Sequence, residues 1–80
     1  MENYKKIKND VTKIINKIDP WGLISAGAPD DEYDEIVNKI ISLYFNKKLD
    51  NQNIKKIFGT AGVSEKIISD IKEEVSMYFI

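Results

Sequence analysis

The sequence predicts an all-α fold in a single small domain that spans residues 1–80. In four separate segments the apolar residues recur at intervals of three or four, as on one face of a helix, and none of these segments alternates like a strand. The 80 residues are 42% hydrophobic and 31% charged, which is the composition of a globular chain with one core. We therefore expect about four helices, three long and one short, with an ordered loop rich in proline, tryptophan and glycine between the first two.

The first expected helix ends near Ile18. Pro20 disfavours the helical conformation for the residue before it, Asp19, so the helix is not expected to continue. The positions between the apolar residues are mostly lysine and asparagine, which suit a solvated face. The apolar stripe of this helix consists of Tyr4, Ile7, Val11, Ile14, Ile15 and Ile18.

The second expected helix begins around Asp30 or Asp31, because either carboxylate can accept a hydrogen bond from an exposed amide of the first turn. The polar run at residues 46–48 marks its end. Its apolar stripe consists of Tyr33, Ile36, Val37, Ile40, Ile41 and Tyr44, and Phe45 follows.

Two more helices are expected in the second half of the chain. The third is short, because Asp50 is placed to cap its start and Gly59 is placed to end it. Ser64 is placed to cap the start of the fourth. The apolar positions are Ile54, Ile57 and Phe58 in the third helix, and Ile67, Ile68, Ile71, Val75, Tyr78 and Phe79 in the fourth.

Three residue types that often carry chemistry are missing from the chain. It has no cysteine, no histidine and no arginine, so all twelve of its cations are lysines. It can therefore form neither a disulfide nor a thiolate metal site, and it lacks the side chain that most often moves protons near neutral pH. We expect no enzyme activity, no catalytic residue, no cofactor and no metal site. The lack of arginine and the net charge of −1 argue against nucleic-acid binding.

The sequence also gives an expectation for location. No stretch approaches the roughly 18 apolar residues that a membrane span needs, so we expect no membrane partner. Residues 1–7 lack the apolar run of a signal peptide. A cytoplasmic location is the simplest interpretation, and the absence of cysteine agrees with a reducing compartment.

Residues 19–35 differ from the rest of the chain in composition. They hold both prolines, the only tryptophan, two of the four glycines, six of the thirteen acidic residues and no lysine. A plain connector between helices needs only about 2–8 residues. One interpretation is structural: Trp21 and Leu23 fold inward and close one end of the helical bundle, while carboxylates at a helix start gain from the macrodipole.

The structural interpretation explains the acidic residues less well, because a helix start gains from one or two carboxylates and further ones repel each other. The run lacks the alternating ligands and closing glutamate of a calcium loop, so a basic surface of another protein is favoured over a metal. Tyr33 would contact that partner only if exposed, and core packing is the alternative; Trp21 would order the loop. The expected partner-binding residues are Asp30, Asp31, Glu32, Tyr33, Asp34, Glu35 and Trp21.

Part of the chain resembles a known family. Residues 19–24 read Asp-Pro-Trp-Gly-Leu-Ile, and residues 27–34 read Gly-Ala-Pro-Asp-Asp-Glu-Tyr-Asp ahead of an apolar helix pattern. Over residues 11–41 the chain is similar to the YugE-like small bacterial proteins, a helical family of unknown function. The resemblance implies an all-helical domain and brings no activity. This chain departs from the pattern at Glu35, where the family often has proline.

The functional prediction is a non-enzymatic domain that binds another protein. Small acidic helical proteins of bacteria include immunity proteins, which neutralise a cognate toxin, and this chain is similar to them in size, composition and charge layout, by analogy of class alone. In that case the acidic face would meet a basic surface of the toxin. One alternative is a homo-oligomeric structural or regulatory module, such as a homodimer in which lysine-rich helix faces meet the acidic segment of a second copy. The other alternative is a metal-dependent hydrolase.

Overall fold

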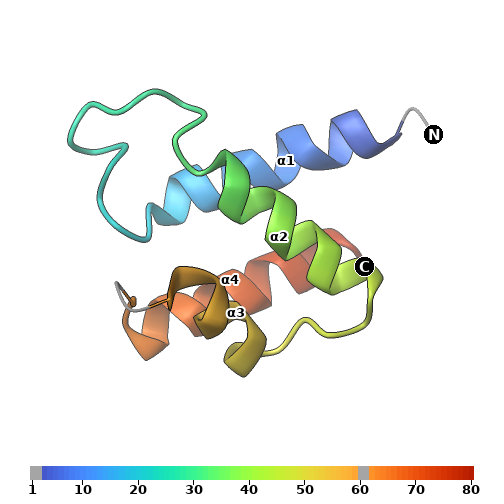
Figure 1. Ribbon diagram of the computed structural model, residues 1–80. Coiled ribbons are helices and arrows are strands. Elements are labelled where there is room, and N and C mark those ends of the chain that lie inside the picture. Colours follow the sequence, from blue (N-terminus) through green and yellow to red (C-terminus); the bar gives the residue numbers. More distant parts are fainter. Residues whose placement is uncertain (1–2, 60–61) are drawn as a thin grey trace.

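Four helices make up most of the protein in a computed structural model that describes residues 3–59 and 62–80 (Figure 1). No strand occurs in those residues, so the all-α prediction is confirmed. Three helices are long and one is short, as expected. Their bounds are Asn3–Ile18 for α1, Asp34–Phe45 for α2, Asn51–Phe58 for α3 and Glu65–Tyr78 for α4.

The helices form a closed ring in which each packs against two others. α1 lies against α2 and α4, and α3 lies against the same two helices from the other side. From one contact to the next, an advance along one helix corresponds to a step back along its neighbour, so α1 runs antiparallel to α2, and α3 to α4. These contacts are Tyr4–Asn38 and Lys8–Asp34 for the first pair, and Asn51–Ser69 and Lys55–Glu65 for the second.

This arrangement gives the bundle two different ends. The long loop between α1 and α2 lies at one end, together with the last residues of α3 (Figure 1). The C-terminal ends of α2 and α4 meet at the other end, where the rings of Tyr44 and Phe79 stack with centroids 3.7 Å apart.

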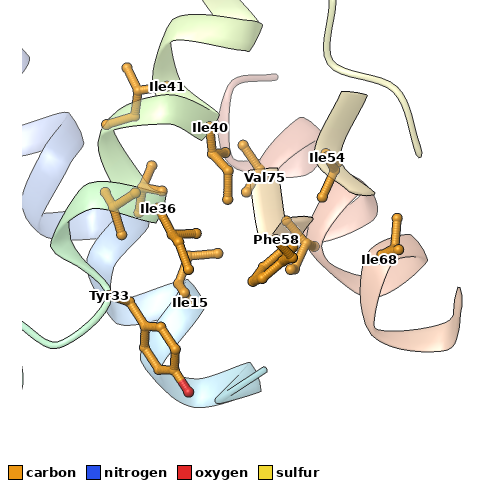
Figure 2. Close-up of a cluster of buried hydrophobic side chains, with 12 residues drawn as sticks. Ile15, Tyr33, Ile36, Ile40, Ile41, Ile54, Phe58, Ile68 and Val75 are labelled. Carbon is orange, nitrogen blue, oxygen red and sulfur yellow. The ribbon is translucent and has the colours of Figure 1, made fainter. Parts of the chain in front are cut away.

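The core is built almost entirely from isoleucine and valine (Figure 2). Isoleucine favours strands by intrinsic propensity, but burial of one helical face outweighs a preference of that size. Every residue of this core belongs to an apolar stripe expected from the spacing, and Pro20 in the loop is buried as well. The core residues are Val11, Ile15, Tyr33, Ile36, Val37, Ile40, Ile41, Ile54, Phe58, Ile68, Ile71 and Val75.

Most helix ends lie where the sequence places them. α1 ends at Ile18, directly before the Asp19–Pro20 pair. The Asp50 carboxylate accepts a hydrogen bond from the Asn53 amide at 2.8 Å, and the Ser64 hydroxyl caps α4 in the same way. Gly59 follows α3 with a φ of 64°, a conformation that glycine adopts without strain. These three capping predictions are confirmed.

The expected start of α2 is wrong by three or four residues. The helix begins at Asp34 and not near Asp30 or Asp31, and no side chain caps it. Residues 29–34 instead form tight turns, in which the amides of Glu32 and Asp34 donate to carbonyls three residues earlier. The first helical hydrogen bond runs from the Val37 amide to the carbonyl of residue 33. The turn that ends at Asp34 thus supplies the acceptor for the first amide of the helix, in place of a carboxylate cap.

None of the helices in the described ranges combines the length and the apolar character that crossing a bilayer requires.

Candidate functional site

Asp19 organises the loop that follows α1. Its backbone has a φ of 55°, in the left-handed region that aspartate tolerates better than most residues. Its carboxylate accepts four hydrogen bonds: from the Ile24 amide at 3.0 Å, from the Ser25 amide and hydroxyl at 2.9 and 2.8 Å, and from the Tyr33 hydroxyl at 2.8 Å. One side chain thus closes the first part of the loop into a ring and ties it to the start of α2.

These hydrogen bonds stabilise the charged form of Asp19. Removal of water around the carboxylate would by itself raise its pKa. The donors from Ser25, Tyr33 and Ile24 outweigh that effect and lower the pKa of Asp19 from 3.8 to about 2. The carboxylate therefore stays ionised throughout the physiological range. Its acceptor sites are occupied by these loop donors, so its position is structural and not that of a general base.

Tyr33 lies at the centre of the same network and has only 1% of its surface exposed. Its ring joins the core, and Figure 2 shows its hydroxyl pointing away from the other labelled side chains. That hydroxyl donates to Asp19 and accepts from the amides of Trp21 and Leu23 at 3.0 and 3.3 Å. Burial, with the hydrogen bond to the Asp19 carboxylate, raises the pKa of Tyr33. The sequence allows Tyr33 either to contact a partner or to pack in the core. The structure shows that it packs in the core, so its side chain is not available to a partner.

Trp21 covers the end of the bundle at which the loop lies. Its indole meets the Phe58 ring edge-on, with centroids 5.3 Å apart, and lies 6.3 Å from the Tyr33 ring. Its Nε1 donates a 2.9 Å hydrogen bond to the Gly62 carbonyl, between α3 and α4. The side chain nevertheless keeps 40% of its surface exposed. Trp21 therefore joins the two halves of the chain and still presents part of its ring to solvent. It closes one end of the bundle, as the structural interpretation expects, and it also leaves aromatic surface exposed.

Three of the expected partner-binding acids lie in the turns ahead of α2. Asp30, Asp31 and Glu32 are all exposed. The amide of Asn16, on α1, donates to the Asp30 carbonyl at 2.9 Å and fixes the turn against the first helix. The helix macrodipole stabilises carboxylates mainly within the first turn of a helix. These three acids lie before that turn, so the macrodipole accounts for their presence less well than it would if α2 began at Asp30 or Asp31.

The other two acids do lie in the first turn of α2 and have lysine partners. Asp34 pairs with Lys8 of α1 at 2.9 Å, and Glu35 lies 3.8 Å from Lys39 one turn further along α2. The Lys8 pair links two helices, whereas the Lys39 contact is an exposed pair of small energetic value. The five acids thus divide into three in the turns and two in the helix that have lysine partners, of which Glu35 is still exposed.

A hollow of about 420 Å³ separates the acidic turns from the solvated side of α1. Polar side chains line it on both sides, and Lys5 and Lys8 bring positive charge close to Asp30 and Asp31. Within residues 3–59 and 62–80, no three acidic side chains are grouped as a metal ion would require. The arrangement provides charge and hydrogen-bonding groups for a polar contact.

Comparison with protein-family models, with curated proteins and with solved structures finds no match to this chain. The similarity to the YugE-like proteins therefore stays a prediction.

The hydroxyl of Tyr33 can be tested by removing it alone. In the Tyr33→Phe variant the Asp19 carboxylate loses a donor and two backbone amides lose their acceptor. Because these groups are partly buried, we expect a loss of about 1.5–3 kcal/mol in the free energy of unfolding, measured with urea. Tyr4→Phe is the matched control, since its hydroxyl makes an exposed hydrogen bond, and a loss below about 1 kcal/mol is expected there. Equal losses in the two variants would contradict a central role for Tyr33.

The lowered pKa of Asp19 predicts an acid-dependent contribution to stability. The folded pKa of about 2 lies below the unfolded value of 3.8, so the contribution is complete above the unfolded value and is lost as the pH falls to the folded one. The Asp19→Asn variant should be less stable than the wild type near neutral pH, and the gap should narrow between about pH 4 and pH 2. Urea unfolding across that range measures it. A gap of constant size would mean that Asp19 is not held in its charged form.

Trp21 should contribute less to stability than a fully buried tryptophan would. Because two fifths of its surface stays in water, we expect Trp21→Ala to cost about 2–3 kcal/mol, below the 3–5 kcal/mol typical of a buried ring. Trp21→Phe keeps one aromatic ring at this position and loses the hydrogen bond to the Gly62 carbonyl with part of the indole packing, at a cost of about 1–2 kcal/mol. Thermal unfolding followed by circular dichroism compares the two. If Trp21→Ala unfolds at the wild-type temperature, the indole does not secure the end of the bundle.

Proposed function

We propose that this protein is a non-enzymatic binding domain that engages a basic surface of another protein through its acidic turns. The most specific form of the proposal is an immunity protein that neutralises a bacterial toxin. One observation carries it: Asp30, Asp31 and Glu32 stand exposed ahead of α2, on turns that the rest of the fold holds in place. Repulsion among neighbouring carboxylates is a cost in the free protein that a basic partner would remove.

Order in the loop supports this proposal. The carboxylate of Asp19 and the hydroxyl of Tyr33 fix the backbone on either side of residues 26–32. A surface that is ordered before binding loses less conformational entropy when the partner arrives. The exposed carboxylates would also attract a basic protein from a distance and accelerate the encounter. Together these properties suit a small protein that must capture its target quickly.

The buried position of Tyr33 narrows the proposed contact surface. Asp30, Asp31, Glu32 and Glu35 remain exposed for charge contacts, Asp34 is shared with Lys8, and the uncovered part of Trp21 provides aromatic surface. Tyrosine and tryptophan often dominate binding energy, so the exposed part of Trp21 is a candidate anchor. A cytoplasmic location belongs to this proposal, because a chain without cysteine suits a reducing compartment.

The experiment uses the product of the reading frame next to this gene as the candidate partner. Co-expression tests whether the chain restores growth of cells that the neighbouring protein harms. Binding kinetics are then measured at low and high salt for the wild type and for Asp31→Asn/Glu32→Gln. Glu73→Gln/Glu74→Gln is the matched control, because it removes two exposed carboxylates on α4.

For the loop variant we expect an association rate lower by up to about tenfold at low salt and a weaker salt dependence, because steering acts through screened long-range charge. Its free energy of unfolding should stay within about 1 kcal/mol of the wild type. The α4 control should associate at close to the wild-type rate. If the loop variant unfolds, the turns have a structural role; if both variants associate equally fast, the acidic turns do not guide binding. A neighbouring protein that neither binds nor harms cells would contradict the immunity form of the proposal.

A further inference from the structure

A second surface with the character of a binding site lies at the opposite end of the bundle. The C-terminal ends of α2 and α4 meet there and expose large apolar side chains: Phe45 at 56%, Met77 at 62% and Ile80 fully. Tyr44 and Phe79 stack at this end with their ring planes 7° apart, and Phe45 meets both rings edge-on. We call these five residues the aromatic end.

The two ends of the bundle differ in how they are covered. Trp21 and the loop shield the end formed by Phe58 and the start of α2, whereas no segment of residues 3–59 or 62–80 shields the aromatic end. Figure 1 shows the chain's C label beside the end of α2, away from the long loop. Exposed apolar surface that gathers in one place, as it does here, is a feature of interaction sites.

The aromatic end is hollowed and has polar groups at its edge. A depression of about 600 Å³ has apolar walls from Tyr44, Phe45, Leu49 and Phe79. Lys47 and Ser76 line the same depression and supply an ammonium and a hydroxyl group. This volume lies within the range of about 300–1,000 Å³ typical of ligand sites, and apolar walls with a few polar groups are their usual lining.

The charges at this end indicate what occupies it. Lys47 and its neighbour Lys48 are both exposed, and neither takes part in the ion pairs found within the described residues. A second copy bound about a two-fold axis through the depression would gather four lysine ammonium groups in one small interface, which is unfavourable. A ligand that carries a carboxylate beside an apolar group would instead complement both the walls and the rim.

We propose that the aromatic end docks a segment of a partner protein in which an aromatic or long aliphatic side chain stands close to an acidic residue. The apolar side chain enters the depression and packs against Phe45 and Phe79, which line it, and the carboxylate pairs with Lys47. This site is separate from the acidic turns, so one domain presents two surfaces of opposite chemistry at its two ends.

The test selects ligands from a phage library of random dodecapeptides with the whole chain as bait. Enriched sequences should combine an aromatic, leucine, isoleucine or methionine residue with a nearby aspartate or glutamate. Synthetic peptides of those sequences are then titrated into the wild type, Phe45→Ser and Lys47→Gln. Tyr4→Ser and Lys56→Gln are the controls, since they change an exposed aromatic and an exposed lysine away from the depression.

Phe45→Ser should weaken peptide binding by more than about tenfold, and Lys47→Gln should weaken it less while reducing its salt dependence. Phe45 is exposed, so this variant should keep the wild-type circular dichroism spectrum. The acidic-turn variant Asp31→Asn/Glu32→Gln should bind the peptides as the wild type does, which separates this test from that of the proposed function. Failure to enrich peptides, or enriched peptides that bind Phe45→Ser equally well, would overturn the inference. Concentration-dependent dimers in sedimentation that Phe45→Ser abolishes would overturn it in favour of self-association.

Discussion

The hydrogen bond between the Tyr33 hydroxyl and the Asp19 carboxylate is the interaction on which the arrangement of this domain depends. It joins the residue after α1 to the residue before α2, at 2.8 Å, across a loop that contains both prolines of the chain. The same two groups accept all the other hydrogen bonds that link side chains to the first half of the loop, and backbone turns complete its order. The Tyr33 ring enters the core at the same time, so the polar network and the apolar packing share one side chain. Loss of either partner would therefore disturb both.

Much of the fold could be predicted from the sequence because its signals are local. The spacing of apolar residues places the four helices, and Pro20, Asp50, Gly59 and Ser64 mark where three of them start or end. Each of these signals acts within about one helical turn, so the neighbouring residues in the sequence are enough to place the helix ends. The order of the helices around the ring cannot be predicted from such local signals, because it depends on how four apolar faces fit together.

The start of α2 and the role of Asp19 could not be predicted, for the same physical reason. Asp30 and Asp31 carry a strong local signal for a helix cap, yet the chain there is fixed by groups distant in sequence: Asn16 on α1 and the carboxylate of Asp19. Asp19 itself is locally unremarkable beyond the proline that follows it. Its importance arises only when the fold brings the amides of Ile24 and Ser25 to the same oxygens. The composition of residues 19–35 indicates the acidic residues of the candidate site, whereas the pairing of Asp34 and Glu35 depends on where the fold places Lys8 and Lys39.

The position of Trp21 gives the protein a built-in optical probe. The chain has a single tryptophan, and its indole lies where the loop from the α1–α2 pair meets Phe58 and the carbonyl of Gly62 on the α3–α4 side. Partial exposure leaves the ring sensitive to the polarity around it, because each change in cover replaces protein atoms with water. The emission of this one side chain therefore reports whether the two helical pairs are joined. Separation of the two pairs can be followed in the unmodified protein, without an attached dye.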